Sequence, residues 1–248
     1  MQQRWLTALP VFNEVKYVEQ VLQEVRRYSQ DILVVDDGSQ DGTSELLAQQ
    51  PDLERITHDT NLGYGAALRS AFEFAMGRRY DGIITIDCDG QHEPQRIPEF
   101  ITAGQTVPIV SGSRYMQQFS GDSRPPSERR RINELVTAEL NRRLGLHLTD
   151  AFCGFKAYRV EALRELHLTE NGYAMPLELW VQAACRGIVI EERAVPLIYL
   201  DEQRSFGGAL EDAETRLQYY YRVLDRSLAA VELPQACSPV AVCGDDAG

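Results

Sequence analysis

Hydrophobic residues in the first third of the chain follow two alternating patterns. Short, bounded apolar runs, typical of buried strands, stand at Trp5–Leu9, Asp31–Val35, Leu53–Thr57 and Gly82–Ile86. Between these runs, apolar residues recur at helical spacing in Val15–Tyr28, Thr43–Gln50 and Tyr64–Met76. Strands that alternate with helices predict an α/β protein with a doubly wound, mostly parallel sheet flanked by helices.

The rest of the chain is less regular but continues as strands and helices. Helices are predicted at Pro94–Ala103, Glu128–Leu144, Tyr173–Arg186 and Asp212–Val231, and strands at Ile109–Ser113 and Ile188–Ile198. We predict a single domain over residues 1–232, with one half at about 1–115 and the other at about 116–232. Residues 233–248 lack periodicity and end in acidic residues, which predicts a disordered tail.

Charge and composition limit the partners of this chain. Its net charge of −12 makes nucleic acid an unexpected partner and disfavours general attraction to anionic lipid. No apolar stretch reaches the length of a membrane-spanning helix, and the N-terminus lacks the pattern of a signal peptide. We therefore expect a cytoplasmic protein. Any contact with a membrane would be peripheral, at its cytoplasmic face, or through a membrane-anchored partner.

Polar clusters follow three of the predicted strands, at Pro10–Glu14, Asp36–Ser39 and Asp87–His92. In doubly wound sheets, ligands bind beyond the carboxyl ends of the strands. All three clusters fall at those ends, so the sequence places a binding site there.

Asp87 and Asp89 are the most informative of these polar residues. Carboxylates two positions apart point to the same side of an extended chain, where they repel each other unless a cation lies between them. A hard divalent cation, Mg²⁺ or Mn²⁺, prefers such oxygen ligands and keeps positions open for substrate phosphates. The alternative is a surface turn, in which Asp and Gly are common.

Asp36 could accept hydrogen bonds from a nucleobase or ribose, or the cluster could cap the next helix. The loop Asn61–Gly65 suits an anion or a close backbone approach, and a plain tight turn is the alternative. It matches neither a Walker loop nor a dinucleotide fingerprint. Arginines at 114, 129–131 and 204 suit a phosphate in an otherwise acidic protein, although a basic run is more often a solvated face.

In this order, the motifs resemble family 2 glycosyltransferases of the GT-A fold, and within them the dolichyl- and polyprenyl-phosphate mannosyltransferases and glucosyltransferases. The resemblance extends from about Leu6 to about Gly208. The matching segments are Leu9–Glu14, Val34–Thr43, Asn61–Ala67, Asp87–Pro94, Ser111–Tyr115 and Asp150–Arg159.

The resemblance implies roles for individual residues. Nucleotide-sugar binding falls to Pro10, Phe12, Glu14, Asp36, Asp37 and Asp87, in the half at about 1–115. Metal binding falls to Asp87, Asp89 and Gln91, with Mg²⁺ or Mn²⁺ as the cofactor. Acceptor-phosphate binding falls to Arg114, to one of Arg129, Arg130 and Arg131, and to Arg204, mostly in the other half. Asp89, Arg114 and Arg131 are implied to be catalytic.

The implied activity is an inverting, metal-dependent transfer of one sugar from a nucleotide-sugar, of the GDP-mannose or UDP-glucose type, to a polyprenyl phosphate. A phosphate monoester is already largely anionic near pH 7, so this acceptor needs no dedicated base. Glu178 is the candidate base if the acceptor is instead a sugar or protein hydroxyl. A nucleotidyltransferase and a non-catalytic nucleotide-binding protein are further alternatives. Many members of the branch carry C-terminal membrane helices, which this sequence does not show.

Overall fold

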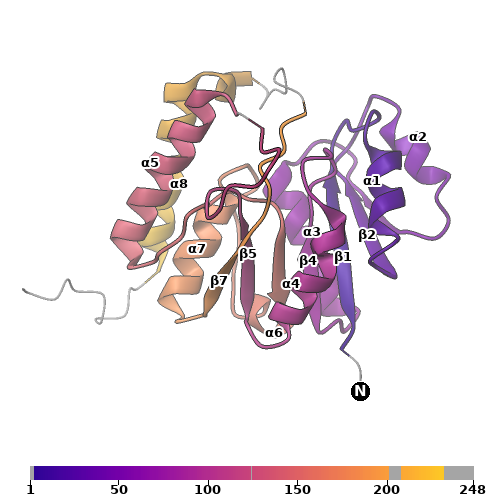
Figure 1. The fold of residues 1–248 in the computed structure, drawn as a ribbon, viewed down its shortest axis with the longest axis horizontal. Helices are drawn as coiled ribbons and strands as arrows, with labels where there is room; N and C mark the ends of the chain where they lie inside the picture. The colour runs from indigo at the N-terminus through magenta and orange to yellow at the C-terminus, as the bar shows by residue number, and fades with distance from the viewer. Residues whose placement is uncertain (1–2, 124, 201–207, 232–248) are drawn as a thin grey trace, which may run out of the picture.

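A single seven-stranded sheet organises the molecule in the computed structural model, which describes residues 3–123, 125–200 and 208–231 (Figure 1). The strands are β1 (Trp5–Val11), β2 (Asp31–Asp36), β3 (Glu54–Thr57), β4 (Gly82–Thr85), β5 (Ile109–Ser113), β6 (Lys156–Arg159) and β7 (Ile190–Ala194). Their order is β3-β2-β1-β4-β6-β5-β7. The mostly parallel sheet is thus confirmed, and both predicted halves contribute to it. Arg204 and the predicted tail at 233–248 lie outside the described residues.

Strand β6 runs antiparallel to both of its neighbours and was not predicted. Tyr158 pairs with Ile83 of β4 on one side and with Ile109 of β5 on the other. The strand has four residues and carries Lys156 and Arg159 at its ends, so it offers no hydrophobic run to recognise. Because β6 is antiparallel, it begins at the edge where β4 ends. The segment before β6 is thereby brought beside the Asp87 cluster.

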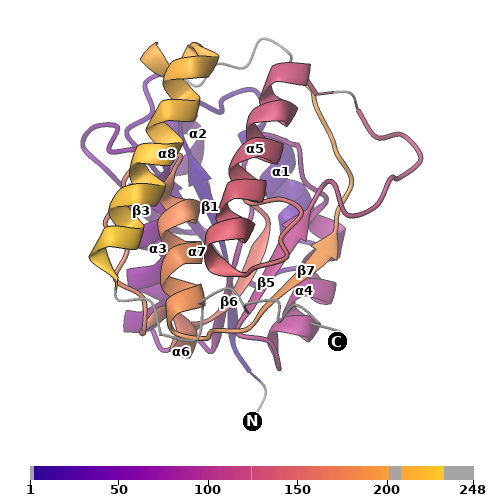
Figure 2. The same ribbon diagram turned by 90° about the vertical axis from the view of Figure 1, so that its left-hand side faces the viewer.

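Helices cover both faces of the sheet, as a doubly wound fold requires. One face packs against α1 (Val18–Val25), α2 (Thr43–Ala48) and α4 (Ile97–Gly104), which the 3₁₀ turn η1 (Pro94–Arg96) precedes. The other face packs against α3 (Tyr64–Gly77), α5 (Ser127–Leu144), α7 (Met175–Cys185) and α8 (Ala213–Ala230). Helices α5, α7 and α8 lie side by side in Figure 2. The short helices α6 (Val160–Leu163) and η2 (Gly208–Glu211) complete the described elements.

Alternation along β1 divides the core into two layers. Leu6 and Ala8 join the cluster under α3 and α7, whereas Trp5 and Leu9 join the cluster under α1 and α4. Pro10 continues the strand, although the sequence predicted an end at Leu9. The last bond of β1 toward β4 runs from the Ile86 N–H to the Ala8 carbonyl. Successive residues of a central strand form hydrogen bonds to the strands on alternate sides, so an N–H at position 10 would face β4. It would lie past the last hydrogen bond between β1 and β4, which is why proline is tolerated there.

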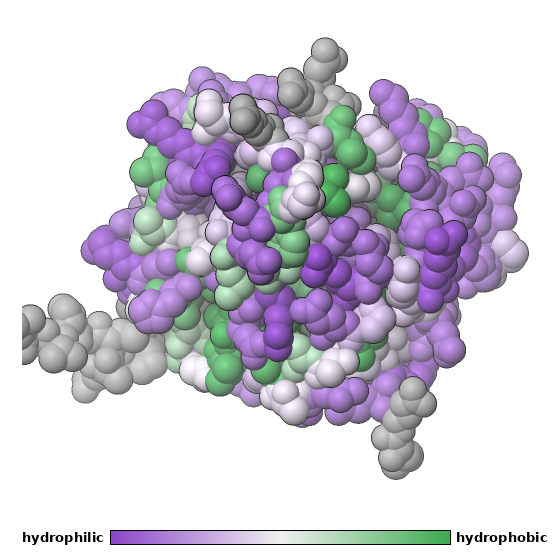
Figure 3. Space-filling model, viewed as in Figure 1, coloured by the Kyte–Doolittle hydropathy of each residue, from purple (hydrophilic) through white to green (hydrophobic). Residues whose placement is uncertain are grey.

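The outer surface is predominantly hydrophilic on the face shown in Figure 3, where apolar side chains form small groups between polar ones. Among the described residues, no helix combines the length and the apolar character needed to cross a bilayer.

Trp5 packs where neither Gly82 of β4 nor Gly104 of α4 could carry a side chain. A Cβ atom added at Gly82 would lie 2.4 Å from the Trp5 ring, and one at Gly104 would also lie 2.4 Å from it. Both contacts are far inside van der Waals distance, and Trp5 is buried in the core. These two glycines are therefore fixed by core packing.

Gly82→Ala is expected to destabilise the protein by about 1–3 kcal/mol, the usual cost of overpacking a filled core. Urea unfolding followed by circular dichroism measures the change. Gly77→Ala is the matched control, because a Cβ at Gly77, in the last turn of α3, meets no atom within 4 Å. Equal midpoints for Gly82→Ala and the wild type would contradict the packing argument.

Candidate active site

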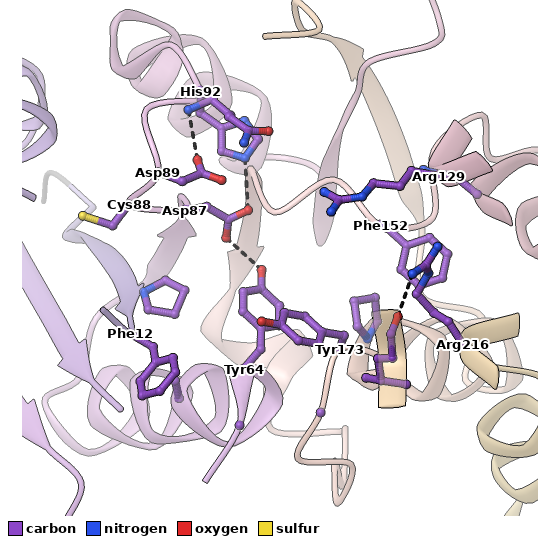
Figure 4. A pocket seen from close by; sticks show the side chains of 18 of the residues that line it. Phe12, Tyr64, Asp87, Cys88, Asp89, His92, Arg129, Phe152, Tyr173 and Arg216 are labelled. Carbon is purple, nitrogen blue, oxygen red and sulfur yellow. Dashed lines mark hydrogen bonds and ion pairs between the residues drawn. The ribbon is translucent and has the colours of Figure 1, made fainter. Parts of the chain in front are cut away.

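A cavity of about 620 Å³ opens at the carboxyl edge of the sheet, beside the ends of β1, β4 and β5. Nine of the residues predicted for the site line it: Pro10, Phe12, Glu14, Asp37, Asp87, Asp89, Gln91, Arg114 and Arg129. In Figure 4, Phe12 lies on one side of the cavity, Arg129 and Arg216 on the other, and the two aspartates between them. Residues from both halves of the chain therefore share one cavity.

Two side chains hold the Asp87 carboxylate. The Tyr64 hydroxyl donates to Oδ1 at 3.0 Å, and Nε2 of His92 lies 3.3 Å from Oδ2 (Figure 4). Burial and the nearby Asp87 charge raise the pKa of Tyr64 well above its usual value, so the phenol remains a donor. The backbone of Gly154 completes the contact, since a Cβ there would lie 2.1 Å from Oδ2 of Asp87.

Asp89 is buried and faces the cavity from a tight turn. Its Oδ1 accepts the Gln91 N–H at 2.9 Å, and Gly90 between them has a φ of +74°. Among the described residues, no group of three His, Cys, Asp or Glu side chains is arranged to hold a metal. Mg²⁺ is commonly bound by one or two carboxylates together with substrate phosphates. Asp87, Asp89 and the Gln91 amide fit that kind of site.

Two neighbouring aspartates at the carboxyl end of β2 have different roles. Asp37 lines the cavity, and its carboxylate accepts the N–H groups of Leu62 at 2.9 Å and Gly63 at 2.8 Å. Asp36 is fully buried and lies outside the cavity lining, where it accepts the Ser39 N–H at 3.0 Å and the Ser44 hydroxyl. The prediction that Asp36 faces the nucleotide is thus not supported by its position. Its side chain closes the loop after β2.

The loop Asn61–Gly65 provides a close backbone approach. A Cβ at Gly63 or Gly65 would lie 2.4 Å from the backbone oxygen of Asn171 or Glu170, respectively. The Asn171 carbonyl also accepts the Ala66 N–H at 3.1 Å. These glycines let the start of α3 pack directly on the 170–172 loop. The packing therefore supports the close backbone approach, one of the alternatives that the sequence left open for this loop.

Arg114 lines the cavity but is bound to a fully buried partner, Asp150. Its Nε and Nη2 donate to the two carboxylate oxygens at 2.6 and 2.9 Å. Burial alone would raise the pKa of Asp150, but the Arg114 charge and hydrogen bonds from Arg114 and Asn133 lower it to about 2. Asp150 is therefore ionised at neutral pH, and Arg114 compensates its charge.

The arginines at the start of α5 point in different directions. Arg129 lines the cavity and donates to the Tyr199 hydroxyl. Arg130 is exposed, pairs with Glu134 at 2.8 Å and lies over the Tyr115 ring. Arg131 is also exposed and outside the cavity lining, so its predicted catalytic position is not supported by the structure.

Several lining residues were not singled out in the sequence. Arg216 of α8 is 2% exposed and donates to Glu128 of α5 at 2.9 Å and to the Leu210 carbonyl at 2.6 Å. Tyr64, His92, Phe152, Tyr173 and Tyr220 also line the cavity without having been predicted as site residues. The helix 212–231 is recognisable in the sequence as rich in Tyr and Arg, but its inward face depends on packing against α5 and α7.

Glu178, the candidate base, is committed to structure. It is buried in α7, where Oε2 accepts the N–H groups of Thr169 at 2.8 Å and Glu170 at 2.7 Å, and Oε1 accepts the Thr169 hydroxyl at 2.8 Å. It is not among the lining residues of the cavity. Its carboxylate instead fixes the loop that carries Tyr173, whose ring stacks on Tyr64 with centroids 5.8 Å apart.

Comparison with known proteins gives relatives over most of the chain. The family model described as "Glycosyl transferase family 2" matches residues 7–167. Undecaprenyl-phosphate mannosyltransferase of Micrococcus luteus is 31% identical over 85% of this chain and 90% of its own length. Polyprenol monophosphomannose synthase of Mycolicibacterium smegmatis is 32% identical over 81% of this chain and 79% of its own length.

Solved structures share the fold at low sequence identity. Glucosyl-3-phosphoglycerate synthase from Mycobacterium tuberculosis, in complex with Mn²⁺, UDP and glucosyl-3-phosphoglycerate, superimposes with a TM-score of 0.67 at 20% identity, covering 92% of this chain and 79% of that one. Mannosyl-3-phosphoglycerate synthase from Rubrobacter xylanophilus gives 0.66 at 18% identity, covering 96% and 79%. These likenesses confirm the predicted GT-A fold.

Arg114→Ala is expected to lower the free energy of unfolding by about 3–5 kcal/mol, because it leaves the Asp150 carboxylate buried without its cation. Arg130→Ala is the matched control, since its pair with Glu134 is exposed and such pairs contribute about 1 kcal/mol or less. Chemical denaturation of both variants measures the difference. If both variants lost the same free energy of unfolding, the buried pair would contribute no more to stability than the exposed one.

Glu178→Gln is expected to cost about 1–3 kcal/mol of stability, since hydrogen bonds from the Thr169 and Glu170 N–H groups to a charged carboxylate are replaced by weaker bonds to a neutral amide oxygen. The pH profile of kcat should keep its shape, because the carboxylate is engaged in structure. Thermal unfolding and a pH–rate profile of the same preparation test both statements. Loss of a general base would instead lower kcat by about 10²–10⁴-fold and remove a limb of the profile.

Proposed function

This chain belongs to glycosyl transferase family 2, and from that premise we propose that it transfers a single sugar from a nucleotide-sugar to a polyprenyl phosphate. The observation that carries the proposal is one cavity with acidic residues in its middle and arginines at one end. The names of the relatives support the acceptor class, since they include an undecaprenyl-phosphate mannosyltransferase and a polyprenol monophosphomannose synthase.

The donor belongs at the end of the cavity that the first half of the chain forms. Pro10, Phe12, Glu14 and Asp37 line that end and offer an aromatic ring and carboxylates to a nucleoside. A GDP-mannose or UDP-glucose type of donor suits this end, and the mannosyl relatives favour mannose. Of the two aspartates predicted to bind the nucleotide-sugar, Asp37 lines the cavity and Asp36 does not.

Mg²⁺ or Mn²⁺ is the proposed cofactor. Asp89 and Gln91, with Asp87, would hold it next to the donor diphosphate. When bound, the ion stabilises the negative charge that develops on the departing nucleoside diphosphate. Tyr64 and His92 keep the Asp87 carboxylate oriented by their contacts with its two oxygens. The protein thus contributes a preorganised acidic centre.

The acceptor phosphate oxygen acts as the nucleophile. It attacks the anomeric carbon in line as the bond from that carbon to the diphosphate oxygen breaks, so the configuration inverts. A phosphate monoester is largely dianionic near pH 7, and no proton has to be removed. Consistent with this chemistry, no described lining residue after Gln91 is Asp or Glu. A hydroxyl acceptor, the alternative, would need such a carboxylate within reach.

The place of action follows from the acceptor. A polyprenyl phosphate resides in a membrane with its phosphate at the surface. We therefore propose that the enzyme works from the cytoplasm, in peripheral contact with the cytoplasmic membrane face.

Asp89→Asn is expected to reduce sugar transfer by at least about 100-fold, because it removes charge where the metal and the diphosphate meet. The assay combines Mn²⁺, a polyprenyl phosphate and GDP-, UDP- or dTDP-sugars. Thermal shift under the same conditions reports binding, since a ligand at about 100 times its Kd stabilises by about 2.7 kcal/mol.

Asp59→Asn is the control, an exposed acid outside the cavity lining, and it should behave as the wild type. The proposal fails if the wild type neither transfers nor hydrolyses any donor while Asp89→Asn binds nucleotide as well as the wild type does.

A further inference from the structure

Ser70, His58 and Asp37 form a hydrogen-bonded triad beside the donor end of the cavity. Nε2 of His58 lies 2.9 Å from the Ser70 hydroxyl oxygen, and Nδ1 lies 2.6 Å from Oδ1 of Asp37. The imidazole is largely buried, with 10% of the His58 side chain exposed. Asp37 lines the cavity, whereas His58 and Ser70 do not. The triad therefore ends at a carboxylate that a donor can reach.

The order of the three side chains is that of a hydrolase triad, in which histidine takes the proton of a serine nucleophile. A nucleophile has to be accessible to its substrate, and Ser70 in α3 lies outside the cavity lining. The carboxylate, which is the buried end of a hydrolase triad, is here the end that faces the cavity. The arrangement therefore serves to place Asp37 and not to activate Ser70.

Packed elements fix His58 on both sides. It directly follows β3, and its N–H donates to the Asp36 carbonyl at 2.9 Å, which continues the pairing of β3 with β2. Ser70 supports the far side of the ring from α3. The imidazole thus has a fixed origin in the sheet and a fixed partner in a helix.

The partners of the imidazole decide which nitrogen carries a proton. An ionised carboxylate only accepts hydrogen bonds, so Nδ1 of His58 is the donor to Asp37. Nε2 accepts the Ser70 O–H when the ring is neutral and donates to the Ser70 oxygen when the ring is charged. The hydrogen bond to Asp37 is present in both states. The placement of Asp37 therefore does not depend on the charge of His58.

The Asp37 carboxylate keeps one acceptor position for a ligand. A carboxylate has about four such positions. Oδ1 accepts the Leu62 N–H and the His58 Nδ1–H, and Oδ2 accepts the Gly63 N–H. The remaining position belongs to Oδ2, and the other three bonds fix its direction. Among the described residues, no lysine or arginine forms an ion pair with Asp37, so a ligand has no protein cation to displace.

We propose that His58 is a positioning residue for the nucleotide-sugar donor, an inference that rests on the proposed function. Supported by Ser70, it holds Asp37 so that the open position on Oδ2 faces an N–H of the nucleobase or an O–H of the ribose. Without the His58 N–H, only the loop 61–63 orients the carboxylate. Donor binding then weakens, whereas the transfer step at saturating donor is unchanged.

The test uses two amide side chains that each replace one nitrogen of the imidazole. The amide nitrogen of asparagine lies as many bonds from the backbone as Nδ1 does, and that of glutamine as many as Nε2 does. The wild type and both variants are titrated calorimetrically with GDP and with UDP in the presence of Mn²⁺. The nucleotide that binds the wild type more tightly is used further.

His58→Gln should raise the Kd of that nucleotide by at least about tenfold, because it removes one hydrogen bond to a charged group. His58→Asn should stay within about threefold of the wild type, because it keeps the donor to Asp37 and loses only the neutral contact with Ser70. This order of the two variants is the result expected for a positioning role.

Steady-state transfer to a polyprenyl phosphate gives a second readout. In His58→Gln the donor KM should rise by a similar factor, about tenfold, with an unchanged acceptor KM and an unchanged kcat. General loss of packing would instead lower the melting temperatures of both His58 variants and affect them alike. His147→Gln, the same substitution at an exposed histidine outside the cavity lining, is the control.

The 2′,3′-dideoxy form of the nucleotide identifies the group that Asp37 binds. If His58→Gln no longer weakens binding of the dideoxy form, Asp37 binds a ribose hydroxyl. If the weakening persists, Asp37 binds the nucleobase. Both results support the positioning role.

Other outcomes separate this inference from the proposed function. An unchanged Kd in His58→Gln, or equal losses in His58→Gln and His58→Asn, overturns the positioning role and leaves the transfer reaction standing. If the wild type binds neither GDP nor UDP in the presence of Mn²⁺, the proposed function is overturned, and the role of His58 with it.

Discussion

One buried carboxylate joins the parts of the chain that form the cavity. Asp150 accepts hydrogen bonds from Arg114 at the end of β5, from Asn133 in α5 and from the Phe152 N–H in its own loop. A charge without solvent is tolerated only when its partners surround it, so these three segments are bound to one another at a fixed distance. Arg129 in α5, Phe152 and the Gly154 segment beside Asp87 belong to these segments, so their positions depend on this junction.

A second set of contacts ties α7 and α8 to the start of α3. Glu178 holds Thr169, and Glu170 accepts hydrogen bonds from the Gly172 N–H and from the Tyr219 hydroxyl of α8. The resulting loop packs on Gly63 and Gly65, which brings the rings of Tyr64 and Tyr173 together. Acids that resemble catalytic groups in the sequence are thus used to fix aromatic rings, while the acids that face the cavity lie at the strand ends.

The sequence predicted the parts of the site that depend on strand ends alone. Asp87, Asp89 and Gln91 line the cavity because β4 is a buried strand in a doubly wound sheet. The sequence did not show which of Asp36 and Asp37 faces the cavity. Adjacent residues at a strand end point in opposite directions, and the sequence does not indicate which direction leads to the cavity. The choice among Arg129–Arg131 depended on which face of α5 packs inward. Arg216 could not be predicted as a lining residue, because its position depends on how α8 packs on α5. Strand β6 could not be predicted, because its four residues contain no hydrophobic run.

The position of β6 also sets an order of events during synthesis. β5 follows β4 in the chain but does not pair with it, because β6, made later, lies between them. While the ribosome is still producing α5, the open edge of β4 has no permanent neighbour, and β5 has no fixed place in the sheet. The segment that fills the gap between β4 and β5 is the one that carries Gly154 to Asp87. The nascent chain therefore joins β4 to β5 and brings Gly154 beside Asp87 in the same step.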